Sequence, residues 1–165
     1  MSETTPTTAT PTPGRDYTAA IYGSVLAASV IVGSGNSRDP GPLAILLLIS
    51  GVVFWLAHVY AETAASLHGG WHLTAIGTAL RHEWPLVFAA VPPAITLLIA
   101  AALPEIGPTE GIWLALFVAI LEQQAWGLAA ARRARLTGSA LTGTVLLNLL
   151  IGGLIVALKL ALPGH

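Results

Sequence analysis

The stretch LAILLLISGVVFWLAHVYAETAAS, residues 43–66, decides the fold class. No charged residue interrupts it before Glu62, and about 20 apolar residues at 1.5 Å each are enough to cross the hydrocarbon core of a bilayer as a helix. His58 and Glu62 nevertheless lie within it, four residues apart and therefore on one face of that helix. The stretch predicts a membrane-spanning helix and raises the question of why it carries two ionisable side chains.

The composition of the whole chain agrees with this interpretation. Of its 165 residues 55% are hydrophobic and 9% are charged, and the mean hydropathy is +0.76, which is typical of an integral membrane protein. The net charge of -1 leaves no basic face, so nucleic acid is not an expected partner. The absence of cysteine excludes disulfides and cysteine-bound metals. A dominance of Ala, Leu and Gly, with Arg preferred over Lys, favours a bacterial source.

Several apolar runs are long enough to span a membrane. They are residues 17–35, 43–66, 86–103, 111–131 and 139–162. Because lipid offers no hydrogen bonds to the backbone, such runs form helices, and the chain is expected to be an all-α polytopic transmembrane helix bundle with five spans. The run 17–35 is rich in Ser, Gly and Ala, and the number falls to four if it does not cross. One transmembrane domain, 17–162, then follows a disordered Thr/Pro-rich tail, 1–16.

Two further features shape the region between the second and third spans. Residues 70–82 are too polar to cross, and their apolar side chains recur at helical spacing, so a short interfacial helix is expected there. Within the third span, Pro92 and Pro93 lack the N–H groups that would pair carbonyls one turn earlier. We therefore expect a helix kink at this proline pair.

The distribution of Arg and Lys predicts the orientation. In a five-span arrangement the two sides receive unequal sets: Arg15, Arg81, Arg132, Arg133 and Arg135 against Arg38 and Lys159. Because cytoplasmic loops carry the excess of basic residues, the first side is expected in the cytoplasm. The prediction is a multi-pass protein of the bacterial plasma membrane with a cytoplasmic N-terminus.

Polar residues on three spans fall at a similar predicted depth. Counted at 1.5 Å per residue from the cytoplasmic ends, His58 lies about 12 Å deep, and Glu122 and Asn148 about 14 Å. Glu62 lies about 6 Å deep, near the interface. Because an ionisable side chain in the bilayer is costly, a polar layer of His58, Glu122 and Asn148 is a candidate intramembrane site.

Two interpretations of this layer stay open. In the functional one, Glu122 exchanges a proton that passes through His58 and Glu62 to the cytoplasm, since imidazole titrates in the physiological range. In the structural one, these side chains hold helices together by hydrogen bonds. A small and polar stripe on the last span favours the structural interpretation: Ala140, Thr144, Asn148 and Gly152.

Other motifs give weaker evidence of a metal site, a cofactor or an enzymatic activity. His68 and His72 could contribute to a metal site on the cytoplasmic side, but glycines between them interrupt the helix that would hold them one turn apart, and no metal is expected. Neither a nucleophile motif nor a phosphate-binding loop is present. No cofactor is expected, and an enzymatic activity is disfavoured.

Two segments carry a resemblance to known sequences: FWLAHVYAE, residues 54–62, and HEWP, residues 82–85. They resemble segments of small, uncharacterised polytopic integral membrane proteins of actinobacteria, in which a His-x-Tyr-Ala run precedes an Arg-x-x-Trp-Pro-like turn. The resemblance extends over residues 17–93. It implies membrane location and transfers no activity and no site residues.

The sequence thus predicts an integral membrane protein that contacts the lipid bilayer and has no established activity. A non-enzymatic accessory or structural protein, associated with a membrane-protein partner, explains every polar residue through helix association. The alternative is a small oligomeric proton-linked channel or transporter that uses the His58, Glu122 and Asn148 layer.

Overall fold

The computed structural model describes residues 15–34, 39–65 and 73–161, and all regular secondary structure in these ranges is helical. The elements are α1 (Arg15–Gly33), α2 (Pro40–Ala65), α3 (Leu73–His82), α4 (Trp84–Phe88), α5 (Val91–Ala102), α6 (Pro108–Arg133) and α7 (Gly138–Ala161). The all-α prediction is therefore confirmed. Most of the expected tail, 1–16, lies outside the described residues, and α1 begins within it at Arg15.

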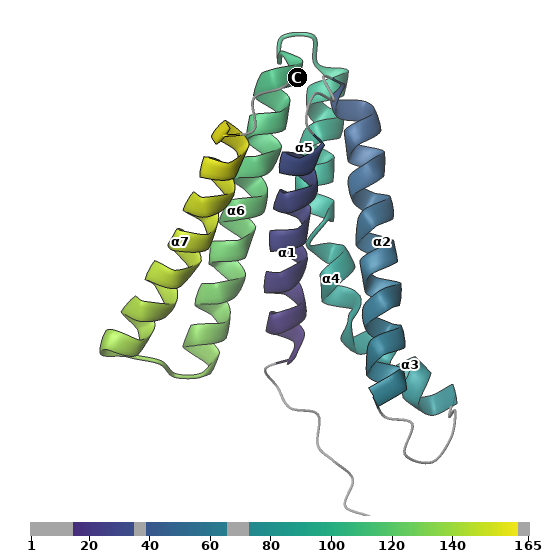
Figure 1. Ribbon diagram of the computed structural model, residues 1–165, viewed down its shortest axis with the longest axis vertical. Helices are drawn as coiled ribbons and strands as arrows, with labels where there is room; N and C mark the ends of the chain where they lie inside the picture. Colours follow the sequence, from purple (N-terminus) through teal and green to yellow (C-terminus); the bar gives the residue numbers. More distant parts are fainter. Residues whose placement is uncertain (1–14, 35–38, 66–72, 162–165) are drawn as a thin grey trace, which may run out of the picture.

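The helices form an elongated bundle (Figure 1). As drawn, α1, α5 and α7 run upward, and α2 and α6 run downward. The helix α1 packs against α6, α4, α2 and α7, whereas α5 packs between α6 and α2. The helix α7 lies at the periphery against α6 and α1.

Three to four helices can span a membrane. The long apolar helices α2, α6 and α7 each have sufficient length, and the bent pair that ends in α5 becomes a fourth span if it crosses as one unit. The apolar part of α1, Tyr17–Gly33, is shorter. Large apolar side chains point outward from the long helices, Leu150 of α7 being 69% exposed, as expected of surfaces that face lipid.

The inner position of α1 follows from a repeat of buried residue pairs along its sequence. Every four residues, two adjacent residues are buried: Ala19 and Ala20, Gly23 and Ser24, Ala27 and Ala28, Ile31 and Val32. Small residues let helices approach closely where lipid provides no hydrophobic drive for association. At Gly23 the approach is close, because a Cβ atom added there would lie 2.7 Å from the carbonyl oxygen of Leu86 in α4.

The expected third span is broken between α4 and α5. The helical stretch Ile76–Phe88 and α5 meet at an angle of 40°. The amide of Ala90 donates to the Val87 carbonyl at 3.0 Å, a one-residue tightening of the helical pattern. Pro92 and Pro93 follow at once, and because they lack N–H groups, the carbonyls one turn earlier lose their helical donors. The break thus lies at Ala89 and Ala90, just before the proline pair.

Residues 73–82 of the expected interfacial segment form the helix α3, with two distinct sides. Thr74, Thr78 and Arg81 are exposed, whereas Ile76 and Leu80 are half-buried. The indole N–H of Trp55 donates to the Leu80 carbonyl at 3.2 Å. This bond attaches α3 to the second half of α2.

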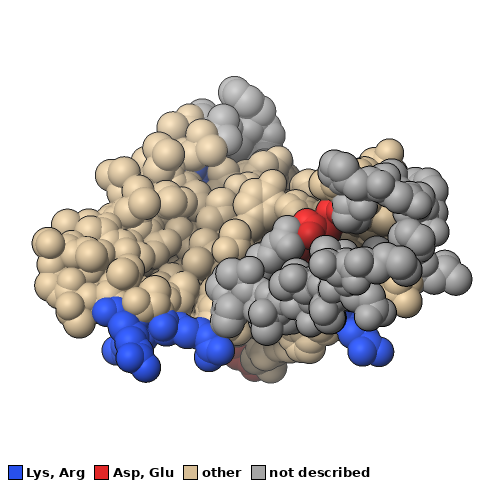
Figure 2. Space-filling view, turned by 90° about the horizontal axis from the view of Figure 1, so that it is seen from below, with Lys and Arg blue, Asp and Glu red and all other residues tan. Residues whose placement is uncertain are grey.

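The two ends of the bundle differ in charge. One end carries the start of α1, the helix α3 and the turn between α6 and α7 (Figure 1). Its exposed arginines are Arg81, Arg132, Arg133 and Arg135, and Figure 2 shows Lys and Arg side chains along one edge of this face. The opposite end carries the loop between α5 and α6, where Glu105 is exposed, and the first turn of α6, where Glu110 is exposed.

Candidate functional site

Two buried polar side chains face each other between α6 and α7. Gln123 is completely buried, and Asn148 of α7 is 8% exposed. The Gln123 side-chain amide donates to the backbone carbonyl of Asn148 at 3.4 Å, a long hydrogen bond. Its own carbonyl oxygen is buried and has no partner among the described residues.

A glycine allows this contact between α6 and α7. A Cβ atom added at Gly127 would collide with the side-chain amide of Asn148. One turn further along α7, a Cβ atom added at Gly152 would lie 3.0 Å from Ile120 of α6. Asn148 therefore rests directly on the α6 backbone, and the pairing of the helices depends on these two glycines.

The small and polar stripe predicted on the last span is only partly an interface. Asn148 and Gly152 are buried, whereas Thr144 is half-buried and Ala140 is exposed. The α6–α7 contact is therefore close at Asn148 and Gly152, whereas Ala140, near the turn, is exposed.

Glu122 lies beside a pair of aromatic side chains. Its carboxylate oxygen Oε1 accepts a hydrogen bond from the indole N–H of Trp126 at 3.1 Å. The Trp126 ring lies 6.1 Å from the ring of Tyr17 in α1, edge to face. The second oxygen, Oε2, is buried without a partner among the described residues. Thus one of the two carboxylate oxygens of Glu122 has a hydrogen-bond partner among the described residues.

His58 has a separate environment on α2. Its Nδ1 lies 3.0 Å from the Phe54 carbonyl one turn earlier. The imidazole ring lies 5.0 Å from the ring of Tyr22 in α1. Glu62 follows one turn later and is half-buried.

The structure brings some of the predicted site residues together and separates others. Asn148 lies next to Gln123, the neighbour of Glu122, whereas His58 lies against the side of α1 that bears Tyr22. Among the described residues, no hydrogen bond or ion pair joins His58 to Glu122 or Asn148. His68 and His72 lie outside the described residues, and within the described ranges no three His, Asp or Glu side chains gather as a metal ion would require.

Sequence reasoning missed Gly127 and Tyr17 as parts of this region. Gly127 is one of two glycines in the apolar run 111–131, and its role depends on the rotation of α7, which hydropathy does not define. The four-residue step from Glu122 to Trp126 was visible, since it puts both side chains on one helix face.

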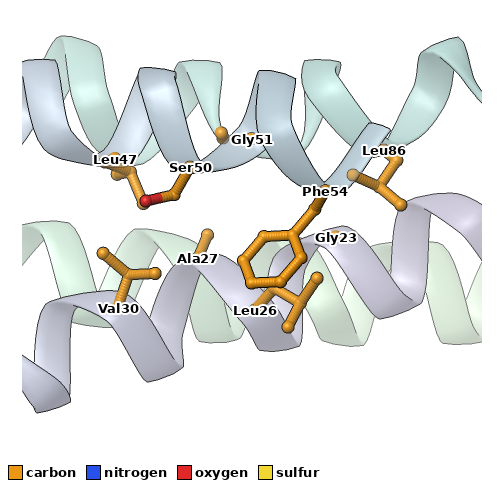
Figure 3. Close-up of a pocket in the computed structure, with 10 residues that line it drawn as sticks. Gly23, Leu26, Ala27, Val30, Leu47, Ser50, Gly51, Phe54 and Leu86 are labelled. Carbon is orange, nitrogen blue, oxygen red and sulfur yellow. The ribbon is translucent and has the colours of Figure 1, made fainter. Parts of the chain in front are cut away.

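A small cavity lies between α1 and α2 beside the helix break (Figure 3). Gly23, Ala27, Gly51 and Phe54 contribute to its wall, and the Ser50 side chain points toward α1 (Figure 3). With walls that are almost entirely apolar and no charged side chain among them, this cavity does not suit an ionic ligand.

The chain was also compared with known proteins. No protein-family model, no curated protein and no solved structure matches it. Its function therefore has to be argued from its own geometry.

Proposed function

We propose that this chain is a multi-pass membrane protein that acts as a non-enzymatic accessory or structural subunit. The contact of Asn148 with Gln123 and Gly127 carries this proposal. Here the buried side chains of Gln123 and Asn148 join two helices of the same chain, which is the use expected of groups that hold a bundle together.

In this proposal the chain crosses the bacterial plasma membrane five times. The helix α1 is the first pass despite its short apolar part, because it lies inside the bundle and packs along α6 (Figure 1). The helix α3 lies along the membrane surface with Thr78 and Arg81 toward water. The exposed arginines at one end favour a cytoplasmic N-terminus.

Mapping the accessibility of terminal tags in intact cells tests this topology. The proposal predicts a cytoplasmic N-terminus and an external C-terminus. Two termini on the same side would contradict five passes.

A subunit role is tested by purification from the native membrane in a mild detergent. The expected result is co-elution with one other membrane protein at fixed stoichiometry, maintained after a high-salt wash. Elution as a monomer or as a homo-oligomer in several mild detergents would contradict the proposal.

Glu122 favours a second candidate, a small oligomeric proton-linked channel or transporter. Its Oε2 atom is buried without a partner among the described residues, which is unusual for a carboxyl group in a bilayer and leaves an atom free to accept a proton. In this candidate His58 and Asn148 belong to the same polar layer. Proton flux that requires Glu122 would favour it over the accessory role.

A further inference from the structure

The turn between α6 and α7 carries three exposed basic side chains close together in sequence. Arg132 and Arg133 lie in the last turn of α6, and Arg135 follows the C-cap residue Ala134. None of the three forms an ion pair or hydrogen bond through its side chain with any described residue. Their charges are therefore available to a partner outside the chain.

The backbone at Arg135 is unusual for a residue with a side chain. Its φ angle is 54°, in the left-handed region that favours glycine. The Leu136 amide donates to the Ala131 carbonyl at 3.0 Å, and the Arg135 amide to the Arg132 carbonyl at 3.0 Å. These two bonds form a Schellman motif, and its left-handed position is most often occupied by glycine.

An arginine at this position costs stability that glycine would not cost. The positive-inside rule does not explain it, because basic residues at any exposed position near the membrane satisfy that rule. A side chain kept at a strained position indicates a use for that side chain.

The surroundings of the turn indicate which partner it fits. The turn joins two helices that can span a membrane. Their outward side chains, Leu121 of α6 and Leu146 and Leu147 of α7 among them, are exposed and apolar. At the end of such a surface the phosphates of lipid headgroups are the nearest anions, and a guanidinium group binds a phosphate through two parallel hydrogen bonds.

We propose that the α6–α7 turn is a binding site for the headgroup phosphate of an anionic phospholipid, held by Arg132, Arg133 and Arg135. The acyl chains lie along the exposed leucines of α6 and α7. This site is independent of whether the chain has a protein partner.

Native mass spectrometry of the purified full chain, with added phosphatidylglycerol or phosphatidylcholine, tests this site. We expect the protein to retain phosphatidylglycerol at activation energies that remove phosphatidylcholine. Each arginine changed to glutamine is expected to weaken phosphatidylglycerol binding about fivefold, and Arg135→Lys to weaken it less. Arg81→Gln, at the same end of the bundle, is the matched control and is expected to bind as the wild type does.

The variant Arg135→Gly separates binding from folding. It relieves the left-handed strain, so its midpoint of thermal unfolding is expected to rise while phosphatidylglycerol binding weakens. Equal retention of the two lipids, or wild-type binding by the variant with all three arginines changed to glutamine, would overturn the proposal. Displacement of the lipid by an equal concentration of inorganic phosphate would overturn it too, because the site would then bind a free anion.

Discussion

Two helix contacts in this bundle use a glycine in different ways. At the α1–α4 contact Gly23 faces the carbonyl oxygen of Leu86, so backbone lies against backbone. At the α6–α7 contact Gly127 faces the side-chain amide of Asn148, so backbone lies against a polar side chain. A backbone atom in a helix cannot move aside, whereas an amide side chain can rotate.

The packing is therefore rigid at the α1–α4 contact and adaptable at the α6–α7 contact. The first contact depends on shape alone, and it lies next to the helix break before Pro92. The second combines a close approach of α6 and α7 with one long hydrogen bond. It leaves one side-chain oxygen each of Gln123 and Glu122 without a partner among the described residues. Substitutions should therefore have larger effects at the α1–α4 contact than at the α6–α7 contact.

Gly23→Ala is expected to have the largest effect. The added Cβ atom would lie 2.7 Å from the Leu86 oxygen and 2.9 Å from the Ala89 Cβ, so α4 must shift, at a cost of about 1–3 kcal/mol in the free energy of unfolding. Denaturant unfolding in detergent, followed by circular dichroism, measures it. Gly33→Ala on the same helix is the control, because a Cβ atom there meets nothing within 4 Å. Equal stability of the two variants would remove the distinction between the contacts.

Gly127→Ala is expected to cost about 1 kcal/mol, at the low end of overpacking effects, because the Asn148 side chain can move. The same change in an Asn148→Ala background should cost less, since the colliding amide is gone. A double-mutant cycle measures this coupling. Additive effects of the two substitutions would mean that Asn148 does not limit the approach of the helices.

Gln123→Met is expected to leave stability unchanged or to raise it by up to about 1 kcal/mol. The variant loses one long hydrogen bond, worth about 0.6 kcal/mol on average in a membrane. It also removes a buried carbonyl oxygen that lacks a partner among the described residues, and burial of such a group costs about 1–3 kcal/mol. Thermal unfolding compares the variant with the wild type. A marked loss of stability would indicate that a bound water or another group satisfies this oxygen.

Lys159→Met is expected to have the smallest effect. The Lys159 ammonium group lies 3.4 Å from the Ile31 carbonyl in the last turn of α1, where a cation stabilises the helix end by about 0.5 kcal/mol. Lys159→Arg keeps the charge and should retain most of this stability in the same unfolding measurement. A loss as large as that of Gly23→Ala would show that the link between α7 and α1 is stronger than its distance suggests.

Hydropathy predicted the helices well because each apolar run must satisfy its own backbone in lipid. The expected span 43–66 became Pro40–Ala65, and 111–131 became Pro108–Arg133. The run 86–103 became two helices, because the break starts at Ala89, before the proline pair that draws attention in the sequence. The membrane assignment thus follows from composition, whereas a local break depends on individual backbone hydrogen bonds.

The rotation of each helix could not be predicted in the same way. In a membrane the outward and inward faces of a helix are both apolar. Hydropathy therefore predicts how deep a residue lies in the bilayer, but not whether its side chain faces lipid or a neighbouring helix. Depth placed His58 at the level of Glu122 and Asn148, but His58 packs against Tyr22 and Asn148 against α6. The pairs of small residues in α1, such as Ala27 and Ala28, were the available signal of direction.

The measurement that tests the packing role most directly is proton flux in liposomes containing the purified chain. With a pH gradient and an imposed membrane potential, we expect the same flux as in empty liposomes, and no change in Glu122→Gln or His58→Ala. Flux above that background, lost in Glu122→Gln while the variant remains folded, would contradict the account and establish the deep polar groups as a proton pathway.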